Sequence, residues 1–232
     1  MTAGVGWIRK PAVLMAGLGV IAATTTAPAN CAPLGPGTTS RPGATMLLDR
    51  QQMAAVTGAV QMTVVTGPHP GLDDASGALD APHCAGVWAP AQKQAYAGSG
   101  WESATAEAAA DSPADTVTHT LDQAVVSFPS PAAAGSYLLR AAAGWAGCAG
   151  KPLTYTEPGH APQTWLIGKP LIVKDKTAVA ISRRLAGQRW SCQRATGAYA
   201  NLIIDVMACG ADPTGQALDA LVAITANIGQ PV

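Results

Sequence analysis

Ser99, His119 and Asp115 are residues of the types that form a hydrolytic triad, in which a histidine base activates a serine nucleophile. The serine lies between two glycines, and this arrangement is not the G-x-S-x-G pattern of a nucleophile elbow. Nothing in the sequence places it at a strand-to-helix turn. We therefore expect no serine hydrolase site here.

Four carboxylates could in principle be paired for acid–base cleavage of a glycosidic bond: Glu102, Glu107, Asp111 and Asp115. They fall in one acidic stretch, which we expect to be a solvated edge. Phosphate-binding loops and dinucleotide fingerprints do not occur in the sequence. The sequence therefore predicts a protein that is not an enzyme and that uses no cofactor.

Four cysteines in the body of the chain predict two disulfides if the protein folds in an oxidising compartment: Cys84, Cys148, Cys192 and Cys209. Three pairings are possible. We favour Cys84–Cys148, which would tie the Trp88 segment to a helix that contains Trp145. The second pair, Cys192–Cys209, would then face each other across a hairpin. A metal site is not expected, because no C-x-x-C occurs and the four histidines are dispersed.

The overall charge excludes two kinds of partner. The chain has 14 basic and 14 acidic residues, and charged residues are 12% of the total, about half the usual share. Nucleic-acid binding requires clustered lysine and arginine, so no nucleic-acid partner is expected. A polybasic contact with anionic lipid is excluded on the same ground.

Residues 1–31 read as an export leader. Arg9 and Lys10 precede an apolar stretch at 12–23, which is too short to span a bilayer comfortably. We favour lipidation of Cys31 after cleavage, which would anchor the protein in the cell membrane. Secretion after the sequence A-P-A at 27–29 and an uncleaved anchor are the alternatives. All three routes place the domain outside the cytoplasm.

Residues 32–45 are rich in proline, glycine and threonine and predict a flexible linker. A single folded domain is expected over 46–232. It should begin with a helix over 50–56, capped by Asp49 and ended by Gly58. A strand is expected over 60–66 and a loop over 67–83.

Further helices are expected over 90–97, from Ser130-Pro131 to Cys148, and after Pro213. The last of them should bury Leu218, Leu221, Val222, Thr225 and Ile228. Strands are expected over 101–108, 116–128, 164–171, 178–184, 189–195 and 202–207. Strands that follow one another without strict alternation with helices favour the α+β class.

Six segments, taken in order, resemble a known family: C-A-G-V-W from Cys84, A-Y-A-G-S-G-W from Ala95, Q-A-V-V-S-F-P from Gln123, W-A-G-C from Trp145, W-S-C-Q-R from Trp190 and N-L-I-I-D-V-M-A-C-G from Asn201. The chain is similar to the extracellular sensor domain of PknH-type bacterial receptor kinases, and the similarity extends over roughly 46–230. It implies a twisted antiparallel sheet flanked by helices, the disulfide pairing favoured above, and a polar cleft for an unidentified ligand.

The matched segments contain the candidate ligand-binding residues: Tyr96, Ser99, Gln123, Gln193, Arg194, Asn201 and Asp205. A polar ligand needs a few convergent donors and acceptors on an apolar frame. Each candidate also has a structural interpretation. Arg194 and Asp205 would form an ion pair, Ser99 and Asn201 would belong to turns, and Tyr96 would lie in the core.

We therefore expect an exported, lipid-anchored domain that binds a small molecule or a cell-envelope component near the Trp88–Trp101 segment and the last hairpin. The family's kinase domain is not recognised in this sequence, so binding rather than phosphotransfer is expected. A second hypothesis is an adaptor that contacts another envelope protein. A hydrolase ranks third.

Overall fold

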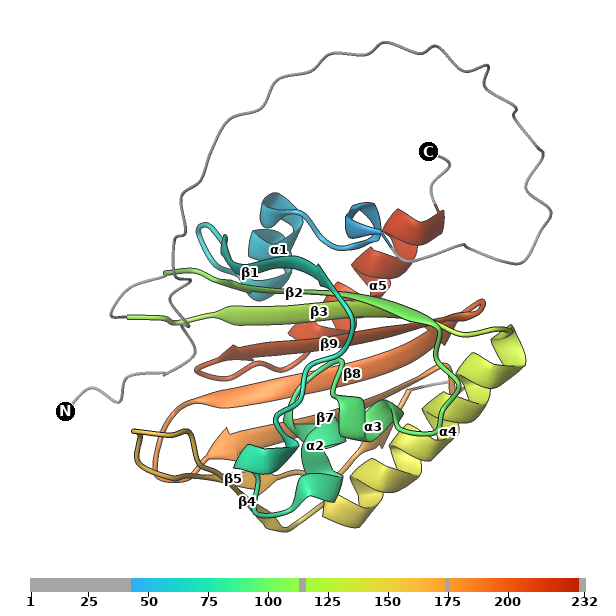
Figure 1. Ribbon diagram of the computed structural model, residues 1–232. Coiled ribbons are helices and arrows are strands. Elements are labelled where there is room, and N and C mark those ends of the chain that lie inside the picture. Colours follow the sequence, from blue (N-terminus) through green and yellow to red (C-terminus); the bar gives the residue numbers. More distant parts are fainter. Residues whose placement is uncertain (1–42, 113–115, 174–175, 230–232) are drawn as a thin grey trace, which may run out of the picture.

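The computed structural model describes residues 43–112, 116–173 and 176–229. These residues form one nine-stranded antiparallel sheet with helices on both faces (Figure 1). The strand order is β1-β2-β3-β9-β8-β7-β5-β4, and β6 pairs with β7. The predicted α+β domain with a twisted antiparallel sheet flanked by helices is confirmed. The predicted leader, the lipidation site at Cys31 and most of the predicted linker lie outside the described residues.

The strands of the sheet are β1 (Thr63–Pro70), β2 (Ser103–Ala110), β3 (Thr120–Ser127), β4 (Pro152–Tyr155), β5 (Gln163–Ile167), β6 (Leu171–Ile172), β7 (Ala178–Leu185), β8 (Ser191–Tyr199) and β9 (Leu202–Gly210). β9 lies in the middle and all nine of its residues are buried. A strand that is covered on both faces reads as a continuous apolar run. In β9 this run contains one charged residue, Asp205.

Helices α1 (Arg50–Thr57) and α5 (Gln216–Gly229) cover one face of the sheet, together with the short 3-10 turn η1 (Ala44–Met46) (Figure 1). The other face is covered by α2 (Ala85–Trp88), α3 (Lys93–Tyr96) and α4 (Pro131–Cys148), with the 3-10 turns η2 (Ser76–Ala78) and η3 (Pro82–Cys84). The core under α1 and α5 is mostly aliphatic, whereas the core under α2–α4 contains the large aromatic residues.

Two helix starts follow the local rules read from the sequence. Asp49 caps α1 in a capping box with Gln52, and Gly58 ends the helix in a left-handed conformation, with φ of 79°. Ser130 accepts a hydrogen bond from the Ala133 N–H at the start of α4. Both helices therefore begin where the sequence predicts.

The predicted helix over 90–97 is wrong in its bounds. Only Lys93–Tyr96 is helical there, because Ala91 has a positive φ of 52° and Gln92 is extended. A left-handed non-glycine residue is held there only by its surroundings. The contact that holds Ala91 in this conformation is a hydrogen bond from its N–H to the buried carboxylate of Asp205.

Three other expectations differ from the structure. β1 begins and ends later than the predicted strand, and the strand predicted over 164–171 is divided into β5 and β6. Pro170 lies between them and has no backbone N–H for the sheet. In α5 the fully buried residues are Ala217, Ala220 and Ile224, whereas Val222 is 66% exposed and was wrongly placed in the core.

Both disulfides form in the predicted pairing. Cys84–Cys148 joins the start of α2 to the end of α4, so it holds the helical cover together. Cys192–Cys209 joins directly opposite positions of β8 and β9. The two bonds close loops with sequence separations of 64 and 17 residues, respectively.

Removing the first disulfide should destabilise the domain more than removing the second, because a longer loop gains more entropy in the unfolded chain. We expect Cys84→Ala/Cys148→Ala to lower the free energy of unfolding by about 4 kcal/mol and Cys192→Ala/Cys209→Ala by about 3 kcal/mol. Urea unfolding without reductant measures both. Equal losses, or the reverse order, would contradict this loop-entropy account.

Candidate functional site

Asp205 is the centre of a buried polar network on the face that α2–α4 cover. Nη2 of Arg194 donates to Oδ1 and Oδ2 of Asp205 at 2.6 and 2.7 Å. The Tyr96 hydroxyl and the Ala91 N–H each donate to Oδ2 at 3.0 Å. The side chains of Arg194 and Asp205 are 3% and 0% exposed, so this is a buried ion pair with additional hydrogen bonds.

Aromatic rings surround the network. The ring of Tyr96 stacks on Tyr137 with centroids 4.3 Å apart, and the guanidinium of Arg194 lies 5.1 Å from the ring centroid of Trp145. Burial raises the pKa of both tyrosine hydroxyls above the ordinary value. Both hydroxyls therefore remain protonated, and Tyr96 acts as a donor that ties α3 to the middle of the sheet.

Arg183 is a second buried guanidinium on the same face, and the sequence analysis did not select it. It projects inward from β7 and is 3% exposed. Its Cζ lies 3.8 Å from the ring centroid of Trp88 and 4.5 Å from that of Trp165. Nη2 contacts the Met207 sulfur at 3.3 Å, whereas Nε and Nη1 have no hydrogen-bond partner. Two donors of a buried cation thus lack a hydrogen-bond partner.

A signal for Arg183 was present in the sequence. Along β7, residues 179, 181, 183 and 185 point to the same face, and the other three members of this row are valine, isoleucine and leucine. A charged residue in a buried apolar row marks a site with a special role. Burial lowers the pKa of Arg183 to about 9, so the group remains protonated at neutral pH.

Asp122 is a carboxylate on the same face. It lies on β3, directly across from Met207 of β9, which in turn is across from Arg194 of β8. Its side chain is half-buried. Burial raises its pKa to about 7, with Arg183 and Arg194 opposing the rise and Asp73 adding to it. Desolvation thus outweighs the attraction of two cations.

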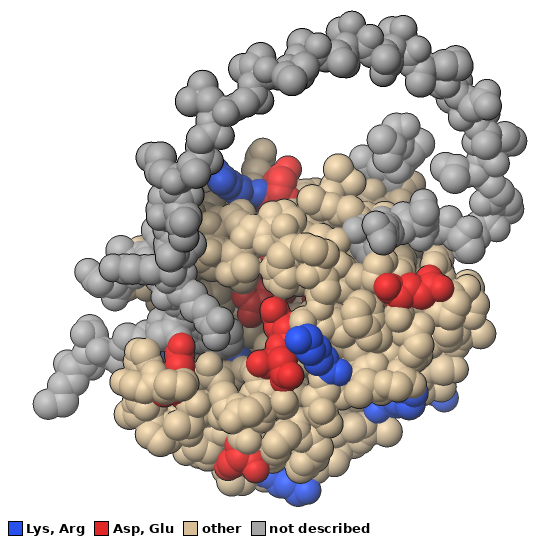
Figure 2. Space-filling model, in the orientation of Figure 1, with Lys and Arg blue, Asp and Glu red and all other residues tan. Residues whose placement is uncertain are grey.

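We call Asp122, Asp73 and Arg183 the Asp122 site. Asp73 lies beside the α2–α3 segment, since its N–H donates to the Ala91 carbonyl and its carbonyl accepts from the Lys93 N–H. Figure 2 shows acidic residues gathered near the middle of this face, partly recessed, with a basic residue beside them. In the described part of the chain, no ion pair within 4.0 Å joins Asp122 to Arg183. The two charges are therefore near enough to interact but are not in contact.

The structure brings three of the predicted site residues together and separates the other four. Tyr96, Arg194 and Asp205 form the buried network. Gln123 and Gln193 lie on the opposite face, where they bind Leu48 and the start of α5, respectively. The Asn201 side chain donates to the Phe128 carbonyl in the β8–β9 turn, and Ser99 lies in the turn after α3. Ligand binding by any of the seven stays a prediction.

The residues considered for hydrolysis are not assembled. Ser99 lies before the start of β2, whereas His119 lies beside its end, where Nδ1 is 3.0 Å from Oδ2 of Asp111. Asp115 is outside the described residues. Glu107, which we expected on a solvated edge, is in fact buried, with 8% of its surface exposed.

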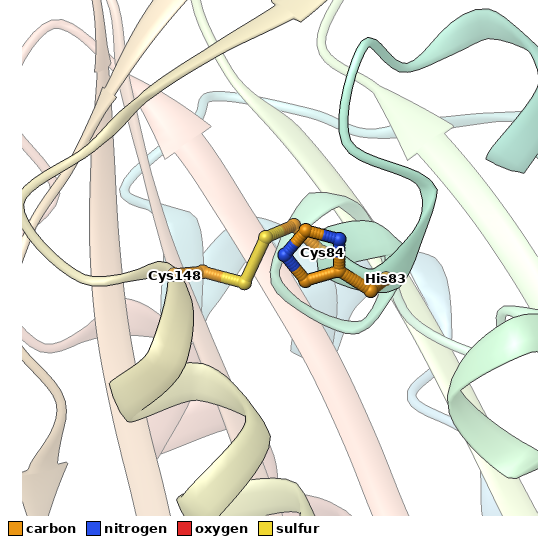
Figure 3. A group of neighbouring side chains, drawn as sticks. All are labelled: His83, Cys84 and Cys148. Carbon is orange, nitrogen blue, oxygen red and sulfur yellow. A yellow bond between two sulfur atoms is a disulfide. The ribbon is translucent and has the colours of Figure 1, made fainter.

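One histidine lies beside two cysteines. Figure 3 shows the His83 ring next to the Cys84–Cys148 disulfide. Because the two sulfurs are bonded to each other, this group offers a metal only the His83 nitrogen. The arrangement does not support a metal centre.

The chain is similar to known proteins over most of its length. A family model described as "PknH-like extracellular domain" matches residues 42–227. The serine/threonine-protein kinases PknH of Mycobacterium bovis and of Mycobacterium tuberculosis H37Rv are each 30% identical over 176 residues. The match covers 74% of this chain and 28% and 27% of the two kinases, respectively. The chain thus spans little more than a quarter of these relatives.

A crystal structure of the extracellular domain of PknH from Mycobacterium tuberculosis has a similar fold. The TM-score is 0.72 at 26% sequence identity, and the match covers 80% of this chain and 93% of that one. Among the described residues, none of the helices has the length and apolar character needed to cross a membrane.

The buried ion pair gives a prediction on stability. Asp205→Asn should lower the free energy of unfolding by about 3–5 kcal/mol, because it leaves the Arg194 charge buried without a counter-ion. Arg194→Met/Asp205→Asn should lose less than the single variant, since neither charge remains. Denaturant unfolding measures both, with Arg184→Met on the exposed face of β7 as a near-neutral control. A double variant that is less stable than Asp205→Asn would contradict this role.

The raised pKa of Asp122 gives a prediction on pH dependence. A carboxyl whose pKa is higher in the folded state favours folding when it is protonated, so its contribution is complete below pH 4 and is lost as the pH rises towards 7. Carboxyl NMR should show Asp122 titrating near neutrality. Asp122→Asn should remove this part of the pH dependence, whereas Asp219→Asn on α5 should retain it. Titration of Asp122 at its ordinary value would contradict the prediction.

Proposed function

The chain belongs to the family of PknH-like extracellular domains, and on this premise we propose that it is an exported, lipid-anchored domain that binds a small polar molecule or a cell-envelope fragment at the Asp122 site. Binding would serve either to signal the presence of the ligand or to capture the ligand. The family establishes a sensor-type extracellular domain, and the residues of the Asp122 site support the choice of ligand chemistry.

One observation carries the proposal: a half-buried carboxylate lies beside a buried guanidinium that has two unpartnered nitrogens. Buried polar groups are normally satisfied by protein or by ordered water, and each exception requires an explanation. A ligand group between Asp122 and Arg183 would accept from the arginine and donate to the carboxylate. Hydroxyl groups do both, and an ammonium group would serve the carboxylate alone.

The surroundings of Arg183 keep it in place for this role. Trp88 and Trp165 flank the guanidinium, and Trp88 also stacks on Tyr155 with centroids 4.5 Å apart. A preorganised donor loses little conformational entropy when a ligand binds. The Asp205 network and the Cys84–Cys148 disulfide hold the neighbouring α2–α3 segment against the sheet. The Asp122 site is therefore supported on a rigid frame.

The proposed location rests on the sequence and on the disulfides. Disulfides persist in oxidising compartments, and the family is one of extracellular domains. Cys31 follows an apolar leader stretch and is the residue that would carry the lipid. A short linker over 32–45 would then separate the domain from the membrane surface.

An enzyme is not proposed. The relatives are kinases by name, but the matched part is the family's extracellular domain and little more than a quarter of their length. In this chain Ser99 and His119 are at opposite ends of β2, and the most perturbed carboxyl, Asp122, lies beside an arginine. This arrangement suits recognition of a ligand better than acid–base chemistry.

An adaptor that contacts another envelope protein is the second candidate. Three large apolar side chains are exposed on β5 and β6: Leu166 (42%), Leu171 (60%) and Ile172 (58%). Exposed apolar surface occurs at protein–protein contacts. Native mass spectrometry separates this candidate from the ligand-binding domain.

Native mass spectrometry of the protein extracted gently from its own cell envelope should show a small-molecule adduct. The adduct should be at least about tenfold less abundant on Asp122→Asn, because a hydrogen bond to a charged group is lost, and unchanged on Asp219→Asn. An adduct-free wild-type protein that carries a second polypeptide would contradict ligand binding and favour the adaptor.

A further inference from the structure

A groove of about 500 Å³ lies on the other face of the sheet, beneath the start of α1. Its volume is in the range of small-molecule sites. The lining comes from η1, α1, β1, β2 and α5: Ala44, Thr45, Leu47, Leu48, Asp49, Arg50, Gln52, Met53, Val64, Pro68, Glu107 and Asn227. We call it the α1 groove.

Glu107 gives the α1 groove a buried carboxylate. It lies on β2, directly across from Gln123 of β3, and is 8% exposed. Among the described residues its one hydrogen bond comes from Nε2 of Gln123 to Oε1, at 3.2 Å. A carboxylate has two oxygens and about four acceptor positions, so most of its acceptor capacity remains available.

Gln123 cannot satisfy Glu107 further, because its side-chain amide is also hydrogen-bonded to the backbone of Leu48. Its Oε1 accepts from the Leu48 N–H at 2.8 Å, and its Nε2 also donates to the Leu48 carbonyl at 3.0 Å. This pair of bonds holds the segment before α1 against the sheet. The Gln123 amide therefore fixes the groove wall and leaves Glu107 facing the groove.

The remaining lining has two properties. Leu47, Leu48, Met53, Val64 and Pro68 make much of it apolar. Of its charged groups, Glu107 and Asp49 are acidic and Arg50 is basic, so the local charge is negative on balance. Asp49 is exposed to water and caps α1 through the Gln52 N–H, so Glu107 is the buried acid of the groove.

We propose that the α1 groove binds a small organic cation, in which an ammonium or guanidinium group pairs with Glu107 and an apolar body contacts Leu47, Met53 and Val64. A cation would supply the donors that Glu107 lacks, and the apolar lining would bury its hydrocarbon part. An anion would be repelled by Glu107. This site is separate from the Asp122 site, because adjacent residues on β2 and β3 point to opposite faces.

Binding of a cation in the α1 groove should depend on pH through the protonation of Glu107. Burial raises its pKa above the ordinary value, while the Gln123 hydrogen bond and the Arg50 charge oppose the rise. β1 contributes only Val64 and Pro68 to the groove lining, and neither is charged. Affinity for a cation should fall as the pH drops through the Glu107 pKa, since the protonated acid offers no charge.

Two-dimensional NMR titration with n-pentylammonium tests the proposal. The probe should shift the backbone amides of Leu48, Glu107 and Gln123, whereas n-pentanol should bind at least about tenfold more weakly and pentanoate should not bind at these amides. Glu107→Gln should lower the affinity for pentylammonium by at least about tenfold. The variant retains an acceptor for Gln123, and thermal unfolding checks that it is folded.

Ala44→Trp serves as a second variant, because Ala44 is exposed on η1 and lines the groove. It should block the probe without disturbing the core. Asp122→Asn should bind pentylammonium like the wild-type protein. The α1 groove is therefore tested independently of the proposed function at the Asp122 site. Equal binding of pentylammonium and pentanoate, or full affinity in Glu107→Gln, would overturn the proposal.

Discussion

Two guanidinium groups buried on one face of a single sheet constrain the rest of this domain. Removing a cation from water costs several kcal/mol unless charge and hydrogen bonds replace the lost hydration. Arg194 receives a carboxylate, Asp205, with both oxygens in contact. Arg183 receives two tryptophan faces and a sulfur, with Asp122 near but not in contact. Nε and Nη1 lack a hydrogen-bond partner in both arginines, but only Arg194 has a carboxylate in contact that balances its charge.

This difference connects the fold to the proposed function. Asp205 reaches beyond Arg194 to the Ala91 N–H and the Tyr96 hydroxyl, so the ion pair also determines where α2 ends and α3 begins. The same segment places the Trp88 ring against Arg183, and the Cys84–Cys148 disulfide links this segment to α4. The network thus holds this segment rigidly against the sheet, and Arg183, which has no carboxylate in contact, is the cation that we propose responds to a ligand.

The sequence predicted the features that depend on near neighbours. Asp49 and Ser130 cap helices through residues three positions away, and two disulfides follow from an even set of cysteines in the body of the chain. It did not predict features that depend on contacts far along the chain. Ala91 takes a left-handed conformation because of Asp205, 114 residues later. Glu107 is buried because Gln123 and the segment before α1 enclose it, although its neighbours in sequence resemble a solvated edge.

A crystal structure of the domain at neutral pH, at a resolution that shows ordered water, is the most direct test of the central claim. The account predicts density for a water molecule or a bound small molecule that bridges the Asp122 carboxylate and the free nitrogens of Arg183. A direct Asp122–Arg183 ion pair, with no group between them, would satisfy both charges within the protein. That result would contradict a ligand site at this position.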